Sequence, residues 1–156
     1  MPAEWEPHAA TWLAWPHERR DWPGKFAAIP WVYAEVVRQL VRGERVRLLV
    51  TDAPMERSAR RVLARAGVDL SRVDFYRIPT DRSWTRDFCP LFVRRDADGD
   101  IALTNWRFNA WAKYPNWRRD DAAAGRIARR LGRREWKLDV VLEGGAIDVN
   151  GRGTLL

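Results

Sequence analysis

Cysteine and histidine are scarce in this sequence. Its 156 residues contain one cysteine, Cys89, and two histidines, His8 and His17. A single thiol cannot build an intrachain disulfide framework or a multi-thiolate metal site. Neither histidine has a second histidine four residues away, or the nearby cysteine and carboxylate ligands of a zinc site. We therefore expect no metal, no cofactor and a reducing compartment, the cytoplasm.

Long apolar runs are also missing. Every hydrophobic stretch is interrupted by a charged residue well before the ~20 residues that a membrane-spanning helix needs. Residues 1–6 are acidic and aromatic, unlike the basic and then apolar start of a secretory signal. We expect no membrane association, and a cytoplasmic location fits this pattern as well.

Positive charge is the feature in excess, with a formal net charge of +7 and a pI near 10.4. Such a balance favours a polyanionic partner such as nucleic acid. However, many arginines fall between apolar positions in predicted helices, for example at 57–61 and 126–130, where they would simply face solvent. Exposed helix faces thus explain the arginines without a nucleic-acid partner. The alternative to an enzyme is a basic module that binds nucleic acid.

The first half of the chain alternates strand and helix patterns. A bulky apolar run at 11–15 ends at Pro16 and predicts a strand, and later prolines and glycines mark helix starts and ends. The predicted order is strand 11–15, helix from Pro30 to Gly43, strand 46–50, helix from Pro54 to Gly67, and strand 73–78. The face of the first helix is predicted to consist of Val32, Tyr33, Val36, Val37, Leu40 and Val41.

The second half predicts an antiparallel hairpin, a helix and a further strand. Segments 91–93 and 101–108 flank Asp98-Gly99, a dipeptide typical of tight hairpin turns. A helix at 122–131 and a strand at 138–142 follow. The whole pattern predicts an α/β fold with mixed sheets, formed by residues 1–156 as a single domain.

A second hairpin is predicted at the end of the sequence. Residues 146–149 have a strand pattern, Asn150-Gly151 favours a tight turn, and 154–156 would be the returning strand. Because so short a returning strand has nothing to pack behind it, we expect the chain to be truncated after Leu156.

Two predicted loops place a carboxylate at the end of a strand. Residues 83–90 contain Asp87 beside Arg86, and residues 142–146 contain Glu143 followed by two glycines that permit a tight turn or close approach to a ligand. The alternatives are a local Asp87–Arg86 salt bridge and an ordinary turn. If neither holds, the two loops could converge on one pocket.

Other candidates are weaker. The aromatic stretch 108–114 could form the wall of a pocket or cover the core. Cys89 lies two residues after Asp87, so an extended backbone would point both side chains the same way, although a buried thiol is the simpler interpretation. No Ser lies in a Gly-x-Ser-x-Gly elbow, and no glycine loop is suited to phosphate.

Taken together, several segments resemble the agmatine deiminase and bacterial-type peptidylarginine deiminase family. They are residues 1–8, 11–16, 83–87, 108–111 and 142–145, in matching order and spacing, and the similarity continues to Leu156. The resemblance implies the pentein fold, an α/β propeller of ββαβ units around a pseudo-fivefold axis, of which this chain would form an incomplete fan.

The resemblance also implies a chemistry and a site. Family members hydrolyse a guanidinium carbon by attack of a cysteine thiolate through a thiouronium intermediate, as in the conversion of agmatine to N-carbamoylputrescine and ammonia in putrescine and polyamine biosynthesis. By the match, Asp87 and Glu143 are catalytic residues that hold the guanidinium, while Trp84 and Trp111 line the substrate site. Carboxylates suit this role because a planar guanidinium presents a fork of N–H donors.

The sequence departs from the family pattern in two ways. Cys89 stands where many relatives have glycine, and the family's catalytic histidine, in a Gly-His-x-Asp motif, and its nucleophilic cysteine would follow Leu156. We therefore expect this N-terminal part to be inactive alone. The alternatives are peptidyl-arginine as the substrate and a non-catalytic remnant, and self-association of the full-length enzyme is left open.

Overall fold

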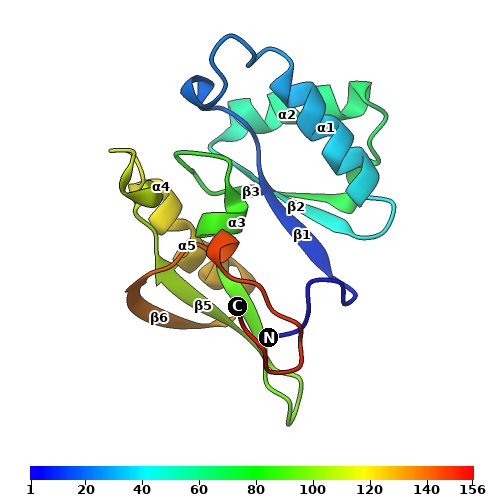
Figure 1. The fold of residues 1–156 in the computed structure, drawn as a ribbon. Coiled ribbons are helices and arrows are strands. Elements are labelled where there is room, and N and C mark those ends of the chain that lie inside the picture. The colour runs from blue at the N-terminus through cyan, green and yellow to red at the C-terminus, as the bar shows by residue number, and fades with distance from the viewer. The chain divides into compact units, whose positions relative to one another are not determined.

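The computed structural model describes all residues, 1–156, and the chain groups into two compact units, one of residues 8–84 and one of residues 1–7 with 85–156. The first unit contains a three-stranded parallel sheet in the order β1-β2-β3, with a helix in each crossover (Figure 1). Its elements are β1 (Ala10–Ala14), α1 (Ile29–Leu40), β2 (Arg45–Val50), α2 (Ala53–Arg65) and β3 (Val73–Arg77), with short 3₁₀ turns at Arg19–Asp21 and Leu70–Arg72.

The core of this unit lies between one face of the sheet and the two helices. Alternate residues of β2 point into it, because successive side chains of a strand face opposite sides. The predicted strand and helix order is confirmed. The predicted face of α1 is partly wrong, since Val32 and Val36 are exposed while Ala34 and Val37 are buried. The buried cluster consists of Trp15, Ala34, Val37, Val41, Val46, Leu48, Val50, Ala59, Leu63, Val68 and Val73.

The second unit begins with a short helix and the predicted hairpin. Helix α3 (Thr85–Phe88) precedes β4 (Leu91–Arg94), which pairs antiparallel with β5 (Ile101–Arg107). Gly99 has a φ of 74° in the connecting turn, a conformation that glycine adopts without strain. Arg95 also binds Asp98 across the turn, with N···O distances of 2.7 and 2.8 Å. The Asp98-Gly99 signal is thus confirmed as a hairpin.

A helical segment and a third strand complete this sheet. Helices α4 (Arg118–Asp121) and α5 (Ala123–Leu131) connect β5 to β6 (Arg134–Val141), which pairs parallel with β5. Gly132 ends α5 in the left-handed region, with a φ of 61°. Strand β6 begins four residues earlier than the sequence predicts. The sheet β4-β5-β6 therefore contains both antiparallel and parallel pairs, as the mixed-sheet prediction requires.

The last residues fold back as a narrow hairpin. Asp148 and Leu156 exchange two main-chain hydrogen bonds, and Asn150 accepts from the amides of Arg152 and Thr154. Residue 146 belongs to a 3₁₀ turn, Gly144–Ala146, so only the later part of the predicted strand 146–149 takes part. The hairpin loop also contacts the chain start, since a Cβ added to Gly151 would lie 2.7 Å from the main-chain nitrogen of Ala3.

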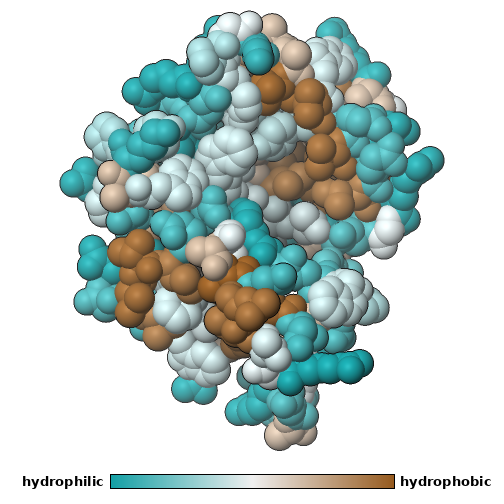
Figure 2. Space-filling view, in the orientation of Figure 1, coloured by the Kyte–Doolittle hydropathy of each residue, from teal (hydrophilic) through white to brown (hydrophobic).

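The two sheets confirm the α/β class with mixed sheets. Whether residues 1–156 act as a single domain stays a prediction. No helix is both long and apolar enough to cross a membrane. Hydrophobic surface does occur locally around β6, where Figure 2 shows brown atoms, and its exposed apolar side chains are Trp136, Val140 and Val141.

Candidate functional site

Asp87 lies in the short helix α3. The buried side chains of Thr85 and Phe88 anchor this helix, and the Phe88 ring lies 6.0 Å from the ring of Phe108. The main-chain amide of Cys89 donates to the carbonyl oxygen of Thr85 at 3.0 Å, a helical hydrogen bond. The interpretation of Asp87 and Cys89 as neighbours on an extended strand is therefore wrong, because the backbone is helical at Asp87.

Glu143 lies in the loop after β6. Its main chain is extended, with φ −88° and ψ 131°, and the 3₁₀ turn Gly144–Ala146 begins directly after it. The side chain is half-buried and makes no hydrogen bond or ion pair with the protein. A carboxylate in this state retains its full capacity to accept hydrogen bonds from a ligand.

The Asp87 helix and the Glu143 loop are in direct contact. The amide of Gly145 donates to Oδ1 of Asp87 at 3.1 Å. A Cβ added to Gly144 would overlap the carbonyl oxygen of Arg86, and one added to Gly145 would overlap Oδ1 of Asp87. Both glycines are thus needed for the close approach, and the two carboxylates come from adjoining segments.

Arg86 does not neutralise its neighbour Asp87. Its guanidinium pairs with the carboxylate of Glu4 and donates to the carbonyl oxygen of Ile147 at 3.2 Å. The alternative of a local Asp87–Arg86 salt bridge is therefore wrong. Neither Asp87 nor Glu143 is paired with a protein cation, and two such carboxylates suit a ligand that carries positive charge and several N–H donors.

Trp111 lies in a strained turn of the same unit. Ala110, Trp111 and Ala112 have φ values of 53–57°, in the left-handed region, which costs roughly 1–2 kcal/mol per residue. Oδ1 of Asn109 accepts from the amide of Ala112 at 3.0 Å, and the ring of Trp111 packs edge-on against Phe108 at 5.1 Å. Such strain persists where surrounding contacts enforce it, commonly at ligand sites. The Trp111 ring is thus held in a defined position.

Trp84 belongs to the unit of residues 8–84 and is 42% exposed. Its ring lies 5.9 Å from that of Trp22, which in turn contacts Tyr33 edge-on at 6.4 Å. Trp84 is therefore part of an aromatic cluster after the ends of β1 and β3. An exposed indole of this kind can cover an apolar ligand surface.

The segments that carry Trp22 and Trp84 are tied together by buried polar groups. Arg82 and Asp21, 2% and 5% exposed in their side chains, form an ion pair. The Nε2 atom of His17 lies 3.0 Å from the carbonyl oxygen of Thr80, and its Nδ1 atom lies 3.0 Å from that of Trp15. Sequence reasoning missed this network, since Asp21 and Arg82 lie 61 positions apart and the sequence has no signal that pairs them.

Cys89 is not in the state of a nucleophile. Burial raises the pKa of its thiol, and the negative charge of Asp120 raises it further. Because only the thiolate is strongly nucleophilic, we predict that Cys89 in the folded chain reacts with iodoacetamide at pH 8 at least about tenfold more slowly than free cysteine. Mass spectrometry of timed samples measures this rate, with chain unfolded in urea as the control. Equal rates for folded and unfolded chain would contradict the prediction.

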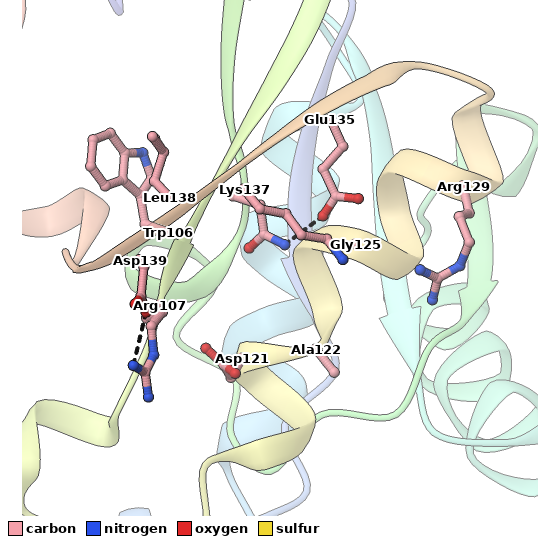
Figure 3. A pocket seen from close by; sticks show the side chains of 11 residues that line it. Trp106, Arg107, Asp121, Ala122, Gly125, Arg129, Glu135, Lys137, Leu138 and Asp139 are labelled. Carbon is pink, nitrogen blue, oxygen red and sulfur yellow. Dashed lines mark hydrogen bonds and ion pairs between the residues drawn. The ribbon is translucent and has the colours of Figure 1, made fainter.

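A pocket of about 460 Å³ lies elsewhere in the second unit, between the strands β5 and β6 and the helices α4 and α5 (Figure 3). None of the four predicted site residues lines it. Its charges are mixed. Asp139 is paired with Arg107 at 2.9 Å, as a dashed line in Figure 3 shows, and Glu135 accepts from Asn105 at 2.6 Å. This pocket therefore has no excess of unpaired carboxylates for a cation.

The sequence of the whole chain matches the model of a known protein family. The family model described as Porphyromonas-type peptidyl-arginine deiminase matches residues 1–156, the entire chain. The chain belongs to this family.

Similar members of this deiminase family include agmatine deiminases. The chain is 36% identical to the agmatine deiminase of Pseudomonas aeruginosa and 34% identical to that of Ectopseudomonas mendocina, in each case over 162 aligned positions. All of this chain and 42% of each relative are covered. The chain thus spans about two fifths of the length of these curated relatives.

Solved structures of agmatine deiminases share the fold. The enzyme of Enterococcus faecalis superposes with a TM-score of 0.86 at 28% identity, covering 99% of this chain and 42% of that protein. The C. jejuni agmatine deiminase with substrate bound superposes with a TM-score of 0.83 at 27% identity, covering 99% and 44%. The resemblance to the family seen in the sequence is confirmed at the level of the fold.

Proposed function

We propose that residues 1–156 supply the guanidinium-binding carboxylates of an agmatine deiminase, as the N-terminal part of a longer catalytic domain. The observation that carries this proposal is the contact between the Asp87 helix and the Glu143 loop, with neither carboxylate paired to a protein cation. Family membership, and the agmatine deiminases among the relatives, support agmatine as the substrate.

The chemistry proposed for the complete enzyme is hydrolysis of a guanidine C–N bond. A thiolate attacks the guanidinium carbon to form a thiouronium intermediate, ammonia leaves, and water releases N-carbamoylputrescine. Asp87 and Glu143 would accept the substrate's N–H groups and fix the orientation of the planar carbon, which lowers the entropic part of the barrier. Trp84 and Trp111 would line the site. This reaction would serve putrescine and polyamine biosynthesis in the cytoplasm.

Neither the thiol of Cys89 nor the imidazole of His17 is suited to the catalytic roles of this reaction. The raised pKa of Cys89 disfavours its thiolate, and both ring nitrogens of His17 face main-chain carbonyl oxygens. We therefore propose that the 156-residue chain binds agmatine without turning it over. Ammonia released from agmatine by the purified chain, above a no-protein blank, would contradict this part of the proposal.

Binding is tested by titrating the chain with agmatine and following amide shifts by NMR. We expect Asp87→Asn and Glu143→Gln each to weaken binding by about 10- to 100-fold, because a hydrogen bond to a charged group contributes about 1.5–3 kcal/mol. Asp139→Asn is the matched control, since Asp139 is 88% exposed and pairs with Arg107 in the same unit. Equal affinities for all four proteins would overturn the assignment of the site.

Peptidyl-arginine is the second candidate substrate, favoured by the description of the family model. The same titration with an acetylated and amidated arginine dipeptide separates the two. Tighter binding of agmatine supports the proposed substrate, and tighter binding of the dipeptide supports protein citrullination instead.

A further inference from the structure

Arg86 carries the same chemical group that the proposed site binds, and it is the sequence neighbour of Asp87. We propose that Glu4 holds the Arg86 guanidinium away from Asp87, so that this carboxylate stays available to an external guanidinium. Glu4 is then a positioning residue, and this role rests on the proposed function of Asp87. The juxtaposition that supports it is the ion pair of Arg86 with Glu4 in place of Asp87.

The stem of Arg86 begins close to the Asp87 carboxylate. Both groups lie next to Gly145. A Cβ added to Gly145 would overlap Oδ1 of Asp87 and would lie 3.6 Å from Cγ of Arg86. Three more bonds separate Cγ from the guanidinium carbon, so rotation about these bonds can bring the guanidinium to Asp87. The length of the Arg86 side chain therefore does not keep its guanidinium from Asp87, and another contact must do so.

An unrestrained Arg86 would be an effective competitor. An intramolecular group has an effective concentration in the millimolar range or above, and a guanidinium binds a carboxylate in a bidentate manner. Asp87 has only Oδ1 engaged, with the Gly145 amide, so Oδ2 could accept from Arg86 as readily as from a ligand. The Glu4 carboxylate and the Ile147 carbonyl oxygen remove this competitor by binding it themselves.

The start of the chain is anchored well enough to present Glu4 at a fixed place. Ala3 is 3% exposed, and its main-chain nitrogen contacts Gly151 so closely that a side chain there would collide with it. The carbonyl oxygen of Ala3 also accepts from the amide of Glu6 at 3.1 Å. Glu4 thus projects from a turn that is packed against the same unit as Asp87 and Arg86.

A first experiment needs no ligand. The Nε–Hε signal of Arg86 is recorded by NMR in the native chain and in Glu4→Gln, each with and without Asp87→Asn. We expect Asp87→Asn to shift this signal at least about twice as far in the Glu4→Gln background, because only there does Arg86 contact Asp87. Equal shifts in the two backgrounds would overturn the inference, whether or not agmatine binds.

A second experiment measures agmatine affinity in the 156-residue chain. Glu4→Gln should weaken binding by about two- to fivefold, the range expected for an exposed ion pair. Arg86→Gln alone should not weaken it, and adding Arg86→Gln to Glu4→Gln should restore it. If the double variant binds no better than Glu4→Gln, the role of Glu4 is only structural and the inference fails.

The two experiments separate the inference from the proposed function. If the native chain shows no agmatine binding while the Arg86 signal shifts further in the Glu4→Gln background, the guanidinium site is overturned. The inference that Glu4 keeps Arg86 from Asp87 is then supported. If agmatine binds in an Asp87-dependent manner while the Arg86 signal shows no coupling, the site stands and the inference is overturned.

Discussion

Asp21→Asn is expected to destabilise the chain by about 3–5 kcal/mol, because it removes a buried negative partner of a buried arginine. The Arg82 side chain is 2% exposed and that of Asp21 is 5% exposed, so the guanidinium cannot be hydrated in place of its lost partner. The asparagine keeps the size of the side chain and changes only its charge. Urea denaturation followed by circular dichroism measures the free energy of unfolding.

The matched control is Asp74→Asn in the same unit. Asp74 pairs with Arg45 at 2.6 Å, but the two side chains are 35% and 45% exposed, so water replaces the lost contact. A second variant, Asp21→Asn with Arg82→Met, removes both charges and should recover much of the loss. If Asp21→Asn costs no more than Asp74→Asn, the Arg82–Asp21 pair is not desolvated as the structure indicates.

The elements that sequence predicted well are those with a strong period and clear ends. Helix α2 begins at Ala53 with Pro54 in its first turn and ends before Gly67, and Oδ1 of Asp52 caps its start by accepting from the amide of Met55 at 2.8 Å. In α1, apolar residues occupy most of the circumference, so periodicity identifies the helix without fixing its rotation. Val32 and Val36 are as regularly spaced as the residues that actually face the core.

Elements that depend on tertiary pairing were predicted less well. The first four residues of β6 are Arg134 to Lys137, and charged residues there conceal the strand, which exists because β5 provides a hydrogen-bonding edge. Helix α3 has four residues, too few to show a period. The left-handed turn at Ala110–Ala112 contains no glycine, so the sequence has no residue that signals it.

In the candidate site, too, local features could be predicted from sequence and features that depend on tertiary packing could not. The local layout of a strand-end carboxylate beside glycines could be identified from sequence at Glu143, and the structure brings that loop to Asp87. The choice of Arg86 between Asp87 and Glu4 could not be made from sequence, because proximity along the chain favours Asp87. It depends on the packing of the first residues of the chain against the loop at Gly151.

The close contact at Gly144 allows the strongest structural test of the site. Gly144→Ala is expected to lower the free energy of unfolding by about 1–3 kcal/mol, because the new methyl group would overlap the carbonyl oxygen of Arg86 and a backbone atom cannot rotate away. Relief requires the Glu143 loop to move from α3, which breaks the hydrogen bond between the Gly145 amide and Asp87.

This displacement should also weaken agmatine binding. A guanidinium gripped by two carboxylates requires both at fixed separation, so we expect Gly144→Ala to weaken agmatine binding by at least about tenfold. Gly43→Ala is the control, because no atom lies within 4 Å of its added Cβ. NMR titration gives the affinity, and the shift of the Gly145 amide reports the lost hydrogen bond. Native affinity in Gly144→Ala, with a displaced Gly145 signal, would show that binding does not depend on the contact between the two segments.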